Sequence, residues 1–421
     1  MKQSKRWLVT SILVSSLSVG TISSFAAAPK AGSKCVKVGA TQTLNGKKFT
    51  CIKSGNKLVW NKGVELPKAQ STPQPLKSNS AIAPEIVSSQ WAEVDKGCIS
   101  EGETAFTLKG PVICFKQLWT LVTRVQDSVE SRAYRFVIEH WNKQPEGSLS
   151  VTFYIDPKSG PWVNEIEAGL RAGARFWQTS EPGSRSIPAF ISEDYQYIED
   201  SLAKAGIPQR EEDKARNRNA QGGQAGWHGN SEDPNAFWDF LFKLPRDRSN
   251  VGYFQVGPHE YTHFAQSKLA KDKLWDDEHM PWIHEGLASY FGSALGPMSK
   301  MPHNQMDNWR GDLKFGGTKL SYFADNSPVV YSSRNWGEVY PMGAIASQAL
   351  VALFGVEGII AYYKDLSTGM GNQKSYIKNF KLNDVALTQF MESYVEDFRK
   401  GNRWSLSTLE TKYKEAVATN S

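Results

Sequence analysis

The feature that most constrains the fold of this chain is the pentapeptide His-Glu-Tyr-Thr-His at residues 259–263. Residues four apart on an α-helix lie one turn apart on nearly the same face, so a helix here would bring both imidazoles to one point. The pattern is typical of helices that bind zinc through the two histidines. The sequence therefore predicts a zinc-binding helix that carries His259 and His263, with Glu260 within reach of a water at the metal.

Catalytic zinc needs a third protein ligand and an open position for water. The candidate is Glu285, which stands in the apolar run Trp-Ile-His-Glu-Gly-Leu-Ala-Ser-Tyr-Phe at residues 282–291. A carboxylate among apolar residues is costly to bury unless a cation compensates its charge. We therefore expect His259, His263 and Glu285 to bind one Zn²⁺, since two histidines and one carboxylate suit this ion.

These two stretches resemble the gluzincin metallopeptidases, and within them the aminopeptidase N-like (peptidase MA-like) catalytic domain. Its members follow His-Glu-x-x-His with a helix of the form Trp-x-x-Glu-Gly-x-Ala-x-Tyr, whose glutamate is the third ligand. Glu285 occupies that place here. The spacing from His263 is a few residues longer than the commonest form, and His284 stands where Asn is frequent. The resemblance thus implies a loop insertion between two helices around the same kind of site.

The same resemblance implies a tyrosine in a Tyr-x-Lys-Gly setting that opens an apolar helix. Tyr340 takes this place in Tyr-Pro-Met-Gly, with Met342 where lysine is usual. Aminopeptidases of this type also bind the peptide N-terminus with a Gly-x-Met-Glu-Asn segment before the zinc helix, and residues 250–256 contain no such acid. The resemblance implies peptide-bond hydrolysis without deciding between exopeptidase and endopeptidase activity.

The expected chemistry uses zinc to lower the pKa of a water molecule. Glu260 would be the general base that takes the proton of this water and passes it to the leaving amine. The hydroxyl of Tyr340 would donate a hydrogen bond to the oxyanion. The substrate would be a peptide or protein, with cell-wall peptides among the candidates.

Two alternatives to a peptidase stay open. One is a non-catalytic cell-surface binding protein that retains the fold, and the other is hydrolysis of a non-peptide amide or ester. The intact Glu260 favours catalysis, because a degenerate peptidase would usually have lost its base. Two predicted site residues also have alternative roles. Glu285 could pair with an arginine instead of a metal, and Tyr340 could pack its ring in the core. We expect His284 on another side of its helix, at the surface or hydrogen bonded to a ligand, and His228 on a solvated loop.

The amino terminus predicts a secretory signal peptide over residues 1–28. Three basic residues precede an apolar run diluted by serines at 8–25, and three alanines at 26–28 offer a cleavage site. A transmembrane helix is the alternative for this segment. The apolar window 343–363 contains a glutamine and a glutamate, so no stable membrane span is expected after cleavage. We expect an exported protein, secreted or associated with the cell surface.

Four cysteines, an even number in an exported chain, predict disulfides. Of the three connectivities we choose the sequential one, Cys35 with Cys51 and Cys98 with Cys114, which closes two short loops. A structural zinc on four cysteines is disfavoured because no Cys-x-x-Cys spacing occurs. We therefore expect two short disulfide-closed loops in the amino-terminal part of the chain.

Composition divides the rest of the chain. Residues 29–62 predict a small Cys-paired β-module with a hairpin turn at Asn45-Gly46, which is either a surface-association module or a passive folding staple. Residues 63–85 form a Pro/Ser-rich linker that cannot bury a core. Residues 86–421 would hold the metallopeptidase-like domain. The net charge of +6, with both signs mixed and no recognised nucleic-acid motif, gives no reason to expect a nucleic-acid partner.

The fold class expected is α+β: a zincin-like domain with a small mixed sheet, zinc-binding helices and a mainly helical C-terminal part, preceded by the β-rich disulfide module. Hydrophobic periodicity supplies the individual elements. They are a helix at 115–140, a strand at 150–155, a helix at 163–179, a strand at 187–191, a polar surface loop or lid at 210–226, a strand at 250–256 and helices from 344 to 417.

Overall fold

The fold was examined in a computed structural model of the 421-residue chain. It describes residues 8–10, 30–44, 47–65, 92–107, 109–145, 151–159, 162–177, 187–207, 222–228, 237–243, 253–271, 273–274, 280–298, 317–324 and 336–420.

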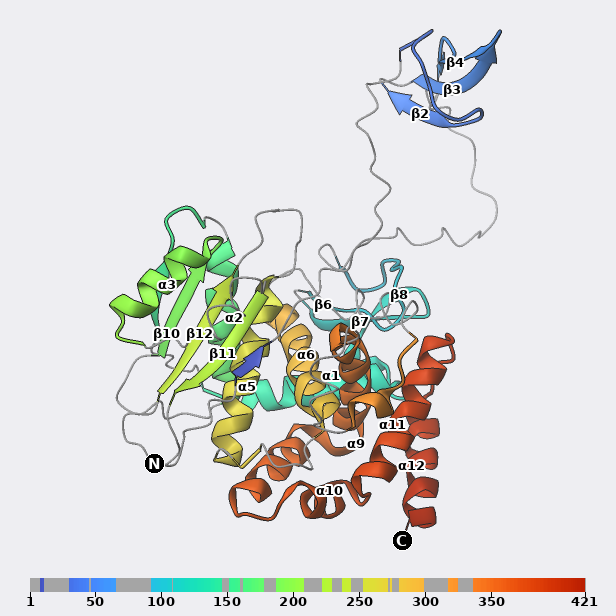
Figure 1. The fold of residues 1–421 in the computed structure, drawn as a ribbon. Helices are drawn as coiled ribbons and strands as arrows, with labels where there is room; N and C mark the ends of the chain where they lie inside the picture. The colour runs from blue at the N-terminus through green and yellow to red at the C-terminus, as the bar shows by residue number, and fades with distance from the viewer. Residues whose placement is uncertain are drawn as a thin grey trace. The chain divides into compact units, whose positions relative to one another are not determined.

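The chain divides into two compact units: the first comprises residues 15–83, and the second comprises residues 84–421 together with residues 1–14. The first unit contains the strands β2 (Thr41–Leu44), β3 (Lys47–Ser54), β4 (Lys57–Trp60) and β5 (Val64–Glu65). The order is β2-β3-β4, with β5 also paired to β3, and all pairs are antiparallel (Figure 1). Leu44 pairs with Lys47, as expected for a hairpin, while its predicted turn at 45–46 lies outside the described residues. The unit is β-rich as predicted.

Both predicted disulfides are confirmed. Cys35 bonds to Cys51, and Cys98 bonds to Cys114, each pair separated by 16 residues. In the first unit the cystine packs with Phe49 and Trp60 as a small core. So small a core stabilises little, and a cross-link that restricts the unfolded chain adds the missing stability.

The second unit contains two separate sheets, an antiparallel one of three strands and a mixed one of five strands. The first sheet contains β6 (Thr104–Thr107), β7 (Gly110–Phe115) and β8 (Leu118–Leu121), and Cys98–Cys114 staples it. The second has the order β1-β11-β12-β10-β9, with β10 parallel to both neighbours. Its strands are β1 (Leu8–Thr10), β9 (Val151–Ile155), β10 (Ile187–Ser192), β11 (Gly222–His228) and β12 (Phe237–Lys243).

Strand β1 lies within the predicted signal peptide and pairs antiparallel with β11. The remainder of that predicted peptide, and most of the predicted linker, fall outside the described residues. Removal of residues 1–28 would take β1 away and leave β11 as an edge of the sheet.

Strand β12 has buried side chains on both faces of the five-stranded sheet. Alternate residues point to opposite faces of a strand, so Phe240 and Phe242 join the main core while Leu241 joins a smaller one on the other face. Helix α3 (Tyr195–Lys204) covers the face of the smaller core, and α2 (Trp162–Trp177) and α5 (Val256–Ala270) lie on the side of the main core (Figure 1). Such sandwiching explains the near-continuous apolar run of Phe237–Lys243.

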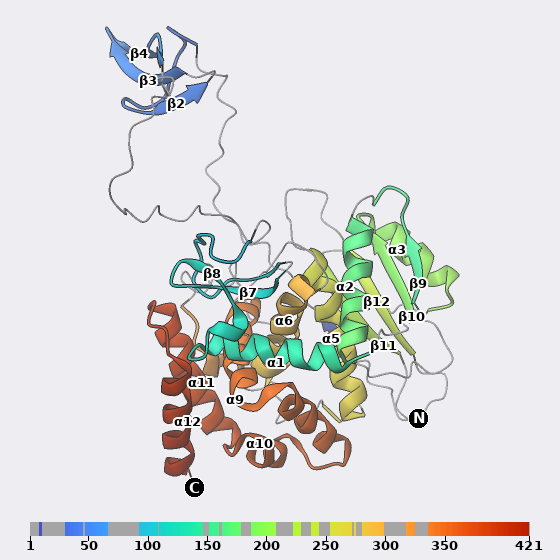
Figure 2. The same ribbon diagram turned by 180° about the vertical axis from the view of Figure 1, so that it is seen from behind.

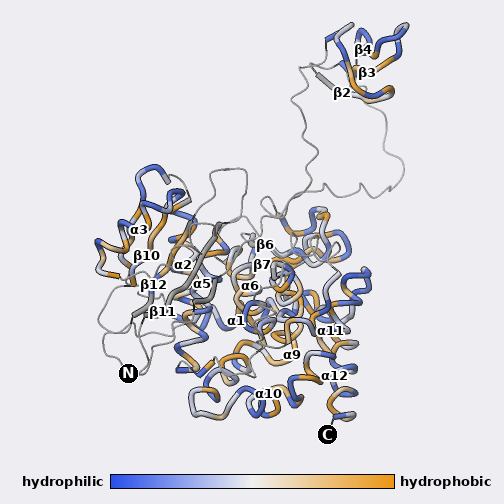
Figure 3. Tube along the Cα trace, in the orientation of Figure 1, coloured by the Kyte–Doolittle hydropathy of each residue, from blue (hydrophilic) through white to orange (hydrophobic). Residues whose placement is uncertain are grey.

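Helices form the rest of the second unit. Helix α6 (Pro281–Met298) lies between α5 and α9 (Val339–Ser367), and α1 (Val129–Lys143) crosses them on the side that faces the viewer in Figure 2. Figure 3 shows hydrophobic residues along α6 and α9, which are largely buried. Helices α10 (Asn372–Phe380), α11 (Asp384–Arg399) and α12 (Leu406–Asn420) complete the chain. The predicted helical C-terminal part is confirmed, and the mixed α+β class with small sheets is as expected.

The helix predicted at 115–140 is wrong over its first half. Residues 118–121 form β8, and α1 starts only at Val129. Lys116 and Gln117 have positive φ values of 51° and 63°, which make a tight hairpin turn that periodicity does not reveal. Ser128 then caps the helix, because its side chain accepts a hydrogen bond from the Ser131 amide at 3.1 Å.

Two more local predictions need correction. The loop predicted at 210–226 is a strand from Gly222 onward, because Ala225 and its neighbours pair with β12. The strand predicted at 250–256 is wrong within the described residues, where 253–255 form a 3₁₀ turn that runs directly into α5. The other predicted strands and the helix at 163–179 are confirmed as β9, β10 and α2.

Helix α9 is the one described helix long and apolar enough to cross a bilayer, and 72% of its apolar window is buried inside the protein. Length and composition therefore do not exclude a membrane span at this helix, contrary to the prediction made from the glutamine and glutamate in window 343–363. Gly355 interrupts the helix with φ 67° and ψ 176°, values that favour glycine.

Close contacts between glycines and neighbouring backbones set the spacing of the central helices. A Cβ on Gly257 of α5 would lie 2.7 Å from the Leu170 amide nitrogen of α2, and one on Gly292 of α6 would lie 2.8 Å from the Gln255 carbonyl. A Cβ on Gly343 of α9 would lie 2.7 Å from the Gly286 Cα of α6. Real Cβ atoms do not occur at such distances. The backbones of α2, α5, α6 and α9 can therefore approach this closely only because glycines lie at the contacts.

We predict that Gly286→Ala lowers the free energy of unfolding by about 1–3 kcal/mol, the range for overpacking. The new methyl group would overlap the Gly343 backbone, which cannot move without shifting α9. Gly317→Ala is the matched control, because no atom lies within 4 Å of its Cβ position. Denaturant unfolding measures both, and equal stabilities for the two variants would contradict this account of helix spacing.

Candidate metal centre

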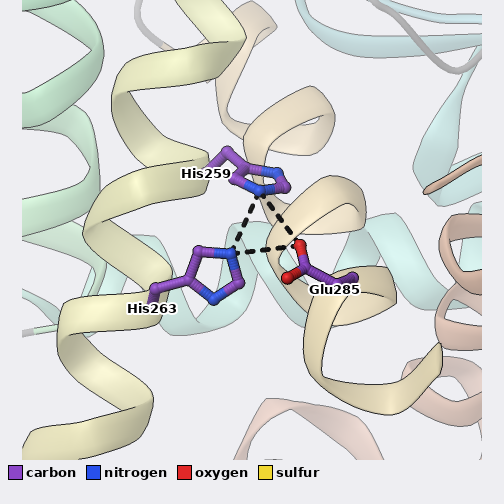
Figure 4. Close-up of side chains that lie close together, drawn as sticks. All are labelled: His259, His263 and Glu285. Atoms are coloured by element: carbon purple, nitrogen blue, oxygen red, sulfur yellow. Dashed lines mark hydrogen bonds and ion pairs between the residues drawn. The ribbon is translucent and has the colours of Figure 1, made fainter. Parts of the chain in front are cut away.

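Three buried side chains from two helices point toward one another in the second unit. His259 and His263 lie one turn apart on α5, and Glu285 faces them from α6 (Figure 4). Their ligand atoms all lie within 4.8 Å of one another. The structure thus brings together the three residues that the sequence predicted as metal ligands.

The distances within the group fit a tetrahedral cation. His263 Nε2 lies 3.1 Å from His259 Nε2 and 3.3 Å from Glu285 Oε2, and His259 Nε2 lies 3.6 Å from the same oxygen. Zinc bonds of 2.0–2.1 Å in a tetrahedron place neighbouring ligand atoms about 3.3 Å apart. The donor set, two imidazoles and a carboxylate, is also one that zinc prefers.

Burial makes the charges of this group strongly interdependent. His259 is 8% exposed, His263 1% and Glu285 3%. Burial alone would raise the pKa of Glu285, but the charge of His263 and hydrogen bonds from both histidines hold that pKa well below its usual range. Burial likewise opposes protonation of His263, and the Glu285 carboxylate outweighs it and raises the His263 pKa. The carboxylate therefore favours positive charge at the point where the three ligand atoms meet.

His259 behaves differently. Burial is the main cause that lowers the pKa of His259, and the neighbouring His263 acts in the same direction. A neutral imidazole keeps a lone pair available for a metal. The lowered pKa of His259 therefore favours the form of this side chain that can bind a cation.

Gln266 fixes the orientation of His263. Its amide nitrogen donates to the His284 carbonyl at 3.0 Å, so its amide oxygen faces His263 Nδ1, also at 3.0 Å. The Nδ1–H of His263 then donates to that oxygen, which leaves Nε2 with its lone pair directed at the other two ligand atoms. A hydrogen bond of this kind to the far ring nitrogen is characteristic of metal-binding histidines. Gln266 was not among the predicted site residues. Its position three residues after His263, on the same side of the helix, is the one sequence feature that could have indicated it.

The remaining predicted site residues lie close to the group. Glu260 is fully buried on α5, and its charge raises the pKa of His263, as expected of a near neighbour. Tyr340, in the first turn of α9, has its ring centroid 6.1 Å from that of His259 and is 8% exposed. Glu260 therefore shares α5 with the two histidines, and Tyr340 approaches the group from a third helix, α9.

The histidines outside the motif differ from their predictions. His284 is buried, and its ring stacks on His263 with centroids 4.4 Å apart, so of its two predicted environments the surface is wrong, while a hydrogen bond to a ligand stays a prediction. His228 ends strand β11 rather than lying on a loop. His140, which carried no sequence signal, is buried between Glu357 on α9 and the Phe176 carbonyl on α2. It joins three helices and takes no part in the metal group.

A pocket of about 600 Å³ in the second unit shares no residue with the metal group. It is bounded by Glu338, two residues before Tyr340, and by the segment around the 3₁₀ turn Leu320–Phe323, and it is open to solvent. The predicted site residues lie deeper, so this pocket does not identify the site.

No protein-family model, no curated protein and no solved structure was found to match this chain.

We predict that Gln266→Leu weakens zinc binding about 10–100-fold, the usual effect of losing a hydrogen bond that orients a ligand. Leucine keeps the bulk but leaves His263 Nδ1 without its acceptor. Gln266→Glu is the matched control: it also loses the donation to the His284 carbonyl, but a carboxylate oxygen still accepts from Nδ1, so it should bind zinc at least as tightly as the wild type. Competition with a chromophoric chelator measures both, and a leucine variant that binds zinc as tightly as the wild type would refute this role.

Proposed function

We propose that the second unit is a zinc-dependent hydrolase of peptide bonds, with Zn²⁺ bound by His259, His263 and Glu285. The observation that carries the proposal is the convergence of three buried ligand atoms at distances suited to one tetrahedral ion. Burying this set is costly unless a cation occupies it. The partial resemblance of the sequence to gluzincin peptidases of the aminopeptidase N-like group supports the same assignment.

The residues around the ligands have the chemistry that hydrolysis requires. When bound, zinc supplies Lewis acidity, which lowers the pKa of a water and polarises a carbonyl oxygen. Glu260 is the general base: it accepts the proton of the attacking water and delivers it to the leaving amine. Tyr340 has its ring next to His259, and its hydroxyl donates a hydrogen bond to the oxyanion that develops on the substrate.

Burial supports catalysis rather than passive binding. Glu260 is 0% exposed and its charge acts on the ligand His263, so its carboxylate is buried beside the ligands, where hydrolysis needs a base. A binding protein that merely retains the fold has no need of this group. The substrate class proposed is a peptide or protein outside the cell, with cell-wall peptides included, and the two disulfides are consistent with an extracellular protein.

We predict that Glu260→Gln abolishes turnover while zinc content and stability stay close to those of the wild type. The amide has the same shape but cannot accept the proton of water, and the loss expected for a general base is about 10²–10⁴-fold in kcat. The measurement is cleavage of a mixed peptide library by the zinc-loaded chain, followed by mass spectrometry.

Glu415→Gln, at an exposed position on α12, is the matched control and should cleave like the wild type. Cleavage by Glu260→Gln at the wild-type rate would overturn the mechanism. Normal zinc content with no cleavage of any peptide by the wild type would overturn the peptidase assignment while leaving the metal site intact.

A further inference from the structure

The positive charge of this protein is concentrated in its first unit. Residues 30–65 contain eight lysines, no arginine and one glutamate, a net charge of +7 against +6 for the whole chain. The rest of the chain is therefore slightly negative, and the sequence-level view that both signs are mixed fails here. The lysines with exposed side chains are Lys30, Lys34, Lys37, Lys47, Lys53, Lys57 and Lys62.

Exposed apolar side chains occur within this basic unit. Val36 is 89% exposed, Val38 58% and Ile52 43%, while the other exposed large hydrophobic residues in the described part of the chain, Ile99, Tyr322, Ile377 and Val385, lie in the second unit. Single exposed apolar residues need no explanation, whereas a group of them indicates an interaction site.

The fold gathers these three residues around one disulfide. Val36 follows Cys35 and Ile52 follows Cys51, and the two cysteine Cα atoms are 5.9 Å apart. Both cysteines are buried, whereas the side chain that follows each of them is exposed. Val38 is held nearby, because the amide of the following glycine donates to the Cys51 carbonyl at 2.9 Å.

Lysines flank the same three residues. Lys34 and Lys37 lie on either side of the Cys35–Val36 pair, and Lys53 follows Ile52. These exposed residues, which flank the two joined cysteines along the chain, form the group that we call the cystine patch: Lys34, Val36, Lys37, Val38, Ile52 and Lys53. The disulfide and the short antiparallel strands fix this arrangement in the folded unit.

We propose that the cystine patch binds the surface of a membrane that contains anionic lipids. Lysines are attracted to the negative headgroups, and the apolar side chains enter the boundary between headgroups and acyl chains. A soluble anionic polymer would use the lysines but gain nothing from the valines and isoleucine. A second copy of the chain would bring two basic groups together, which like-charge repulsion opposes. The patch therefore fits a lipid surface best, and the proposal does not depend on the metal centre.

The test is flotation of the chain from residue 29 onward with lipid vesicles, since the apolar run at 8–25 would itself bind lipid. Vesicles of phosphatidylcholine alone are compared with vesicles that contain about 30% phosphatidylglycerol, near physiological salt. The wild type should bind the anionic vesicles and not the neutral ones.

Two variants separate the contributions of charge and apolar contact. Replacing Lys34, Lys37 and Lys53 by glutamine should weaken partitioning about fivefold for each lysine. Replacing Val36, Val38 and Ile52 by serine should weaken it by at least about fivefold with the charge unchanged. The matched controls replace Lys374, Lys400 and Lys414 by glutamine, or Ile377 and Val385 by serine, at exposed positions in the second unit, and should bind like the wild type.

Several outcomes would overturn the proposal. Equal binding to neutral and anionic vesicles, or no binding to either, removes the lipid partner. If the serine variant binds anionic vesicles as well as the wild type, the patch recognises negative charge alone. The protein should then bind soluble polyphosphate as tightly as it binds vesicles. Dimerisation in sedimentation velocity that the serine variant abolishes would identify a second copy as the partner. Circular dichroism and thiol titration show whether each variant keeps its fold and disulfide.

Discussion

The burial of the Glu285 carboxylate is the constraint on which the second unit depends. A buried negative charge persists only with a compensating positive one, and here two imidazoles from α5 face it within hydrogen-bonding or ion-pair distance. This requires α5 and α6 to approach closely and at a fixed register. Glycines allow that approach, because Gly292 lies against the first turn of α5 and Gly286 lies against Gly343 of α9. The same crossing of α6 and α9 sets where Tyr340 stands relative to His259.

Periodicity and motif spacing predicted the parts of this site that are local in sequence. The four-residue spacing of His259 and His263 specifies a helix and a shared direction, and α5 has both. Glu285 could be named because a carboxylate within an apolar helix needs a partner, and the structure places it opposite the two histidines. The disulfides were predictable for a similar reason, since sequential pairing closes the shortest loops.

Features that depend on packing between distant segments were not predictable. Gln266 gains its role only when α6 brings the His284 carbonyl to it, and the glycine contacts exist only once four helices have assembled. The helix wrongly predicted over the first half of 115–140 has a related cause. The turn at Lys116 and Gln117 needs positive φ values, which neither lysine nor glutamine indicates in a sequence. The uneven distribution of charge was visible in the sequence, and only division of the chain into units shows its meaning.

The metal content of the purified chain tests the central claim most directly. The chain from residue 29 onward and its His263→Ala variant are dialysed against zinc and then against metal-free buffer, and bound metal is measured by mass spectrometry. The account predicts about one zinc per wild-type chain and a loss of at least about tenfold in affinity for the variant, which lacks one of three ligands. No bound zinc in a folded wild type, or the same content in both, would contradict a metal centre at His259, His263 and Glu285.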